Sequence, residues 1–212
     1  LMNVGSLSNR LLHFCNAVVG RFRGGLGHVN VVQSVIFAGM SGSAIADAAG
    51  VGRLIISMMT REGRYTNSYA AAITAASAVV GPIIPPSIPM VLFALVSDAS
   101  IGYLFLGGAV PGLLMAATLM AINSAMARRR GFPVEAPVPL REIPGISLRA
   151  FPALMMPVIL LGGIYGGITT PTEAAAVAAA YAFLIATLLY RDVSPAKAYQ
   201  AVLASARSSA SI

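Results

Sequence analysis

The sequence has no tryptophan, one cysteine and two histidines, and only 10% of its 212 residues are charged. The single cysteine, Cys15, excludes an internal disulfide framework and a cysteine-rich metal site. His13 and His28 stand alone and form no metal-ligand pattern, and His28 is expected to be a plain interfacial residue. No phosphate-binding glycine loop or nucleophile elbow occurs, and the few carboxylates form no acid–base pair. The sequence therefore predicts neither an enzyme nor a cofactor.

The scarcity of charge points to a lipid environment. Hydrophobic residues make up 57% of the chain and the mean hydropathy is +0.81, whereas a soluble domain carries about 25% charged residues. The 21 glycines and the alanine-rich run at residues 174–180 suit helices that pack closely in lipid. These features predict an all-α integral membrane protein.

The net charge of +7 raises the possibility of a nucleic-acid partner. The basic residues, however, occur in short groups between apolar segments and do not gather on one polar face. Membrane topology explains them better, so no nucleic acid is expected to bind.

The first part of the chain contains two predicted elements. Residues 1–28 repeat apolar side chains every three or four positions, which predicts an arm helix in the membrane interface. Residues 29–60 are apolar but are interrupted at residues 39–43 by Gly-Met-Ser-Gly-Ser. Each arm is then shorter than the roughly 20 residues that cross a bilayer. This pattern predicts a re-entrant helical hairpin.

Proline and glycine divide the rest of the chain. Residues 61–127 are predicted to form a transmembrane helix that is discontinuous at residues 81–87, where three prolines block regular helix, and then an uninterrupted span. Residues 128–150 carry four prolines and charges of both signs, which predicts a cytoplasmic linker. Residues 151–212 are expected to begin a second repeat, with two spans and an interfacial helix, in a chain that is a fragment of something longer.

The positive residues support this topology, because they concentrate in cytoplasmic loops. Arg23 and Arg53 fall on the same membrane face only if the segment between them enters and returns from one side. The later spans then bring Arg128 and Arg191 back to that face. Placing all these basic residues on one membrane face therefore agrees with a re-entrant hairpin.

The two interrupted segments predict one binding site. Within hydrocarbon, irregular backbone is tolerated only where it is buried in protein or lines a wet cavity. Each break leaves free carbonyl oxygens at the end of a half-helix, with serine hydroxyls nearby, and such oxygens can replace the hydration shell of a small cation. A plain turn at residues 41–43 and a proline kink at residues 81–87, without any ligand, are the alternatives.

Two acidic residues have competing explanations. Asp47 follows the first break by one turn, and an acid at that depth is costly unless it is paired, hydrated or hydrogen-bonded. It either braces the hairpin tip through nearby amides, which its place beside a helix start favours, or lends negative charge to a cation. Glu173 forms a predicted capping box with Thr170, with Pro171 at the first helical position, and is expected to be structural.

Three motifs, in order and spacing, resemble the large membrane subunit of the tripartite ATP-independent periplasmic (TRAP) transporters. They are Gly-Met-Ser-Gly-Ser-Ala-Ile-Ala-Asp-Ala at 39–48, Gly-Pro-Ile-Ile-Pro-Pro-Ser at 81–87 and Thr-Pro-Thr-Glu-Ala-Ala-Ala at 170–176. The resemblance implies an inverted-repeat, elevator-type transporter in the bacterial inner membrane, driven by a sodium gradient. The implied partners are a small membrane subunit and a periplasmic binding protein, and the implied substrate is a small carboxylate.

The resemblance also implies a sodium site. Carried onto this sequence, it uses serine hydroxyls, backbone carbonyls of glycine and proline, and support from Asp47 behind them; the ligands are Ser41, Gly42, Ser43, Gly81, Pro85 and Ser87. A second hairpin and a second broken helix are expected beyond residue 212, so the chain should hold about half of the binding site. A purely structural membrane subunit, or a sodium-coupled elevator of another family such as a citrate-type transporter, remains the alternative.

Overall fold

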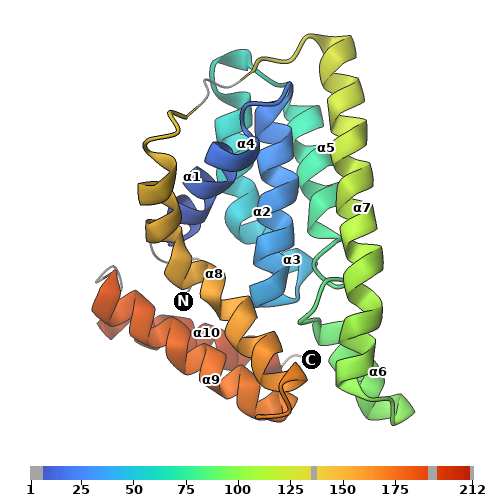
Figure 1. Cartoon of the computed structure of the whole chain (residues 1–212), viewed down its shortest axis with the longest axis vertical. Helices are drawn as coiled ribbons and strands as arrows, with labels where there is room; N and C mark the ends of the chain where they lie inside the picture. The colour runs from blue at the N-terminus through green and yellow to red at the C-terminus, as the bar shows by residue number, and fades with distance from the viewer. Residues whose placement is uncertain (1–6, 135–137, 191–194, 211–212) are drawn as a thin grey trace.

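The computed structural model describes residues 7–134, 138–190 and 195–210, and every regular element in these ranges is a helix (Figure 1). The prediction of an all-α chain is confirmed. Three helical segments are long and apolar enough to cross a membrane: α7 (Ile101–Arg130), α8 (Ile143–Tyr165), and α9 (Pro171–Leu184) with the π-helical turn Ile185–Leu189 that extends it. These spans agree with an integral membrane protein.

A helical hairpin follows the first helix, α1 (Leu7–Val19). Its first arm is α2 (Gly25–Ser41), and its second consists of α3 (Ala44–Asp47), the π-helical turn Ala48–Gly52 and α4 (Arg53–Thr60). The arms run antiparallel and pack together (Figure 1). Entry and exit on one side of the membrane remain a prediction. The first arm starts at Gly25, earlier than the predicted boundary at residue 29.

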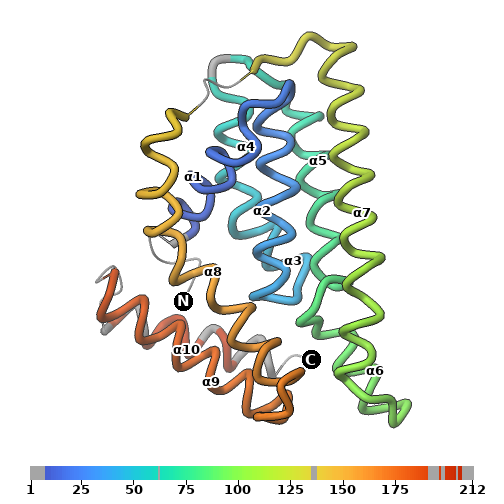
Figure 2. The backbone as a smooth tube through the Cα atoms, viewed as in Figure 1, coloured from blue at the N-terminus to red at the C-terminus, as the bar shows by residue number. Residues whose placement is uncertain are grey.

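The helix after the hairpin is interrupted. A single 3-10 turn, Arg61–Gly63, leads to α5 (Asn67–Ala78), which is separated from α6 (Ile88–Ser97) by residues 79–87 without α-helix. Figure 2 traces this irregular stretch against the turn at the hairpin tip. The two breaks in the chain therefore lie side by side, although about 40 residues of sequence separate them.

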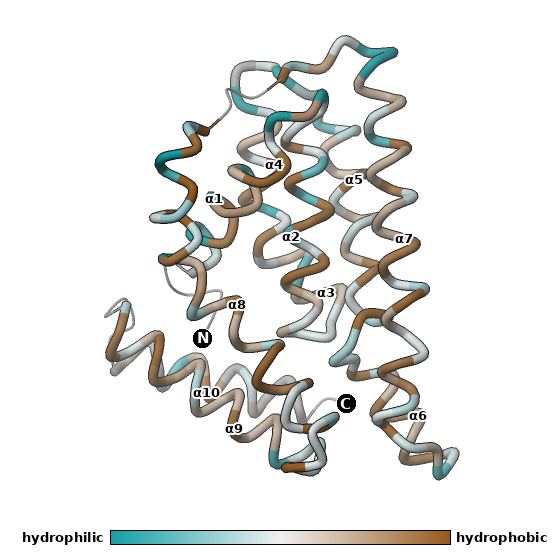
Figure 3. The backbone as a smooth tube through the Cα atoms, in the orientation of Figure 1, coloured by the Kyte–Doolittle hydropathy of each residue, from teal (hydrophilic) through white to brown (hydrophobic). Residues whose placement is uncertain are grey.

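The hydrophobic core lies between the hairpin and α5. Phe37, Ile55, Met59 and Ile73 are buried in one cluster that joins α2, α4 and α5. The outer surface is also apolar: α7, for example, exposes Val110, Leu113 and Leu114. Figure 3 shows hydrophobic residues along the outer helices. An apolar outside combined with an apolar inside suits a protein that is solvated by lipid.

The structure corrects the predicted linker. Helix α7 continues to Arg130 and α8 already begins at Ile143, so residues 143–150 form the first two turns of a span. Pro144 lies in the first turn of α8, where a residue without an N–H group leaves no helical hydrogen bond unmade. Pro144 therefore marks a helix start and not a loop.

The second half of the chain forms a separate pair of helices. Helix α8 packs against α9, and the Tyr181 hydroxyl donates to the Pro152 carbonyl oxygen at 2.9 Å. A capping box of Thr170 and Glu173 starts α9, as the sequence predicts. A last helix, α10 (Pro195–Ala210), follows this pair.

Candidate functional site

The hairpin tip is built by a glycine between two serines. Gly42 ends α2 in the left-handed conformation, with φ of 60°, and its N–H group donates to the Ala38 carbonyl oxygen. Ser43 then starts α3, where its Oγ accepts from the Ala46 N–H group at 3.3 Å. The Ser43 N–H group donates a hydrogen bond to Ser41 Oγ at 3.4 Å. The carbonyl groups that follow Ala38 in α2 are thus at a helix end, where a continuing helix no longer supplies donors.

The break between α5 and α6 is shaped by prolines and closed by Ser87. The peptide bond between Pro85 and Pro86 is cis. Ser87 Oγ donates to the Pro82 carbonyl oxygen at 2.5 Å and accepts from the Met90 N–H group at 3.3 Å, which starts α6. The hydroxyl group of Ser87 is thereby held inside the break, and the side chain is buried.

The two breaks touch through their backbones. A methyl group added to Gly42 would lie 2.5 Å from the Pro86 carbonyl oxygen and 3.2 Å from the Ile88 nitrogen. A methyl group added to Gly81 would lie 3.4 Å from the Ala44 nitrogen. Glycine at position 42 permits this approach, because a side chain there would push the two segments apart, whereas at Gly81 the segments are in ordinary van der Waals contact. The structure brings together all the predicted ligand segments, residues 41–43 and 81–87.

A small cleft opens beside this contact. It measures about 190 Å³ and is lined by Ser41, Pro86, Ser87, Ile88, Val91 and Leu92. Ser41 comes from the hairpin and Ser87 from the broken helix, so both breaks contribute a hydroxyl-bearing residue to the same cleft. The other four lining residues are apolar, so oxygen ligands that suit a small cation are few in the cleft itself.

Asp47 lies behind the tip and does not cap it. The Ala46 N–H group of the tip donates to Ser43 Oγ, while the Asp47 carboxyl group lies near the Ser34 hydroxyl on α2. The expectation that Asp47 binds the tip amides is therefore wrong. Asp47 is 3% exposed, and in the described part of the chain its Oδ2 has no hydrogen-bond partner.

A buried polar seam joins the hairpin to α5. Asn30 Nδ2 donates to Thr74 Oγ1 at 2.6 Å, and Ser34 Oγ donates to Ser77 Oγ at 3.0 Å. Ser77 Oγ is also 3.2 Å from Asn30 Oδ1. All four side chains are buried. The seam runs along the two helices whose ends form the breaks, and it fixes their relative position.

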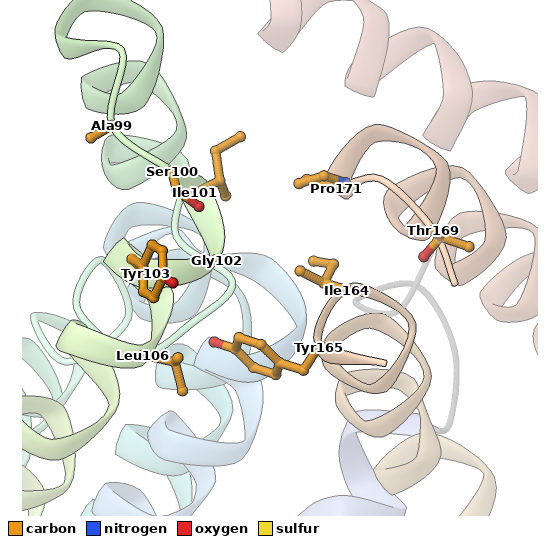
Figure 4. Close-up of a pocket in the computed structure, with 10 residues that line it drawn as sticks. All are labelled: Ala99, Ser100, Ile101, Gly102, Tyr103, Leu106, Ile164, Tyr165, Thr169 and Pro171. Atoms are coloured by element: carbon orange, nitrogen blue, oxygen red, sulfur yellow. The ribbon is translucent and has the colours of Figure 1, made fainter. Parts of the chain in front are cut away.

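Another cavity lies between the start of α7 and the α8–α9 turn (Figure 4). It measures about 540 Å³, and its ten lining residues include Ser100, Tyr103, Tyr165 and Thr169. In Figure 4, Tyr103 and Leu106 face Ile164 and Tyr165 across the gap. None of the lining residues is charged, and none comes from the two breaks. Neither an anion nor a small cation finds a strong ligand set there.

Comparison with known proteins identifies the family of the chain. Residues 1–212 match the family described as the tripartite ATP-independent periplasmic transporter, DctM component. The chain belongs to this family. The resemblance of its motifs to the TRAP large membrane subunit is thereby confirmed, and an elevator of another family is set aside.

Three TRAP relatives illustrate the range of the family. The chain is 44% identical to the sialic acid TRAP transporter large permease protein SiaM of Vibrio cholerae, over 92% of this chain and 45% of the relative. It is 42% identical to the C4-dicarboxylate TRAP transporter large permease protein DctM of the same species, over 92% of this chain and 43% of the relative. It is also 42% identical to the isethionate TRAP transporter permease protein DctMQ of Oleidesulfovibrio alaskensis, over 100% of this chain and 33% of the relative.

Two conclusions follow from the TRAP relatives. They are named as transporter permeases, which agrees with the prediction that the chain is not an enzyme. The chain spans less than half the length of these relatives. A TRAP permease therefore contains more than the elements described above.

Sequence reasoning missed the buried polar seam. Asn30 and Ser34 lie four residues apart in α2 and were not singled out, although Thr74 and Ser77 lie three residues apart in α5 and likewise share one helix face. Polar residues recurring on one face of two apolar helices would have been the signal. His28 was expected at an interface but is 3% exposed, with Nε2 3.1 Å from Ser124 Oγ.

Proposed function

We propose that the full-length protein is a sodium-coupled secondary transporter for the uptake of a small carboxylate. Membership of the TRAP family supports transport, and relatives named for sialic acid and C4-dicarboxylates support the carboxylate. The observation that carries the sodium proposal is the contact of Gly42 with Pro86 and Ile88, which places two interrupted helices together. Helix breaks facing one another are where transporters bind coupling ions.

Sodium would bind between the two breaks. The serine hydroxyls of Ser41, Ser43 and Ser87 and the carbonyl oxygens of Gly42, Gly81 and Pro85 supply hard, uncharged ligands. The tight backbone contact limits the space between them, which favours a small ion without its hydration shell. Asp47 supports the site from behind, through its contact with Ser34 on α2.

We propose an elevator mechanism in which the hairpin, α5 and α6 move as one body. The polar seam of Asn30, Ser34, Thr74 and Ser77 and the cluster around Phe37 and Ile55 support this, because both hold the hairpin to α5. The pair α8–α9 packs mainly within itself and against α1. That pair would begin the second, inverted repeat, and a small membrane subunit would enlarge the fixed scaffold.

The protein would span the bacterial inner membrane several times and receive its substrate from a periplasmic binding protein. The family description, which names a periplasmic transporter, supports both proposals. Arg128, Arg129 and Arg130 end α7 and would face the cytoplasm, because basic residues concentrate on that side. The substrate would then enter at the opposite end, beyond Ser100 at the start of α7.

Removing one hydroxyl from each break tests sodium coupling. We expect Ser41→Ala and Ser87→Ala in the full-length protein to raise the half-saturating sodium concentration about tenfold or more, because each removes an oxygen ligand. Uptake into proteoliposomes, measured against sodium concentration, gives this value.

Ser97→Ala is the matched control, because the Ser97 hydroxyl bonds only to the Phe93 carbonyl oxygen of its own helix, at 2.7 Å. Unchanged sodium dependence in both site variants, with normal assembly, would favour a structural role for the breaks. A loss of assembly in both would call for the milder Ser41→Thr and Ser87→Thr, which keep the hydroxyl group and should restore sodium dependence.

A further inference from the structure

A basic cavity lies between α1 and α8, away from the two breaks. It measures about 390 Å³ and is lined by Arg10, His13, Ile146 and Arg149. Three of these four side chains can donate hydrogen bonds to an anion. The volume falls in the range of about 300–1,000 Å³ in which proteins hold small ligands. The cavity therefore has the size and the polarity of an anion site.

Tyr190 contacts both helices that carry the arginines of the cavity. The Arg10 guanidinium carbon lies 4.3 Å from the centre of the Tyr190 ring, a cation–π contact. The Tyr190 hydroxyl donates to the Arg149 carbonyl oxygen at 2.9 Å. Leu11, Ala150 and Ala153 pack together beneath them and fix α1 against α8 (Figure 1). The cavity walls are thus held in place before any ligand arrives, which lowers the entropic cost of binding.

Within the described residues, the two helices that line the cavity carry only positive charge. Neither α1 nor α8 carries an acidic residue within its described bounds. Glu142, at the N-cap position of α8, does not line the cavity. An anion is therefore favoured over a cation at this place.

The position of the cavity indicates which anion it meets. Helix α7 ends at Arg130 and α8 begins at Ile143, so Arg149 lies within two turns of the end of α8 nearest the positive run. Basic residues mark the cytoplasmic face, whose leaflet is rich in anionic lipids. Leu148 and Leu189, next in sequence to Arg149 and Tyr190, are 74% and 56% exposed and suit acyl chains.

We propose that the cavity between α1 and α8 binds the phosphate group of an anionic phospholipid from the cytoplasmic leaflet. The planar guanidinium groups of Arg10 and Arg149 match phosphate oxygens, which an arginine can hold in pairs. His13 adds a donor, and Ile146 contacts the glycerol carbons. The bound lipid joins the interfacial helix α1 to the α8–α9 pair. This site is independent of the sodium proposal and stands or falls without it.

Native mass spectrometry of the full-length permease tests the proposal. The protein is titrated in detergent with phosphatidylglycerol and with phosphatidylcholine, and the bound lipid is measured. Each basic residue near an anionic lipid contributes about fivefold to its binding. We expect the wild type to prefer phosphatidylglycerol and Arg10→Gln/Arg149→Gln to lose about 25-fold in that affinity. Arg149→Gln alone, at an exposed position that leaves the fold intact, should lose about fivefold.

Arg129→Gln/Arg141→Gln is the matched control, because it removes the same charge from the same end of the spans but leaves the cavity lining unchanged. An equal loss in this control would show diffuse attraction and overturn the site. Equal retention of the two lipids by the wild type would also overturn it. Replacement of phosphatidylglycerol by excess inorganic phosphate would overturn the lipid assignment, whereas retention of the lipid in phosphate would support it.

Discussion

The Asn123 side chain on α7 donates through Nδ2 to the Gly24 carbonyl oxygen at 3.1 Å, across 99 residues of sequence. Asn123 Oδ1 also accepts from the Tyr69 hydroxyl on α5. Asn123 is fully buried, so water does not replace either bond. One side-chain amide therefore joins the loop before the hairpin, α5 and α7.

Removing this amide should destabilise the protein. We expect Asn123→Leu to lower the free energy of unfolding by about 1–3 kcal/mol, because the Tyr69 hydroxyl and the Gly24 carbonyl group lose their buried partner. Thermal unfolding of the full-length permease in detergent measures the effect. Thr118→Ala is the control, since the Thr118 hydroxyl bonds only within α7, to the Leu114 carbonyl oxygen at 2.8 Å. Equal losses in the two variants would contradict a special role for Asn123.

Gly27 should be required for the same contact. A methyl group at Gly27 would overlap the Asn123 side-chain amide, so we expect Gly27→Ala to cost about 1–3 kcal/mol of unfolding free energy. Shortening the neighbour should relieve the overlap, and Gly27→Ala/Asn123→Ala should be no less stable than Asn123→Ala alone. Gly107→Ala on α7, where nothing lies within 4 Å, should be neutral. Additive losses in the double variant would refute the overlap.

The close contact of the two breaks at Gly42 and the strain of its left-handed backbone can be tested separately, with Gly63 as the reference. Gly42 and Gly63 both have positive φ, of 60° and 68°, but only Gly42 faces another segment closely, whereas nothing lies within 4 Å of Gly63. Alanine should cost about 1–2 kcal/mol in the left-handed conformation at either place. Only Gly42→Ala should also push the Pro86 carbonyl oxygen away and reduce sodium-driven uptake at least about tenfold. Comparable uptake by the two variants would count against the site.

Asp47 should act through its contact with α2. We expect Asp47→Asn to keep the half-saturating sodium concentration within about threefold of the wild type, because asparagine retains a hydrogen bond to Ser34. Asp47→Ala should lower the free energy of unfolding by about 1–3 kcal/mol, since it leaves a cavity in the buried space behind the tip. Uptake and thermal unfolding measure the two effects. A tenfold rise for Asp47→Asn would instead assign to Asp47 a direct charge on the cation.

The single cysteine of the chain should not react with maleimide in the folded protein. Cys15 is fully buried, and burial raises the pKa of its thiol to about 12. The reactive thiolate is then present at only about one part in ten thousand at pH 8. Peptide mass spectrometry after maleimide treatment should find Cys15 unlabelled until the protein is denatured. Ile45→Cys, at a tip position that is 81% exposed, should label at once in the native protein.

The helix breaks were predictable because they are local. Gly42 in the first break and the prolines at residues 82, 85 and 86 in the second each disfavour helix by their own covalent structure. The same reasoning failed at Pro144, because proline is equally favoured in the first turn of a helix, and only the neighbours decide between the two.

The polar seam was not predictable in the same way. Ser34 and Ser77 meet across 43 residues of sequence, and Asn30 and Thr74 across 44. Single polar residues in an apolar helix indicate an inner face, but they do not identify the partner helix. The same limit applied to Asp47, whose sequence neighbours suggested the tip amides while folding supplied Ser34.

The seam also restricts which part of the molecule can open. To swing away from α5, the hairpin would have to break the hydrogen bonds of Asn30 and Ser34 to Thr74 and Ser77 and expose these polar side chains of α2 to lipid. This hairpin is consequently unsuited to act as a gate. Access to the substrate would then be controlled by the segment that covers the cleft from the other side, while the hairpin moves together with α5.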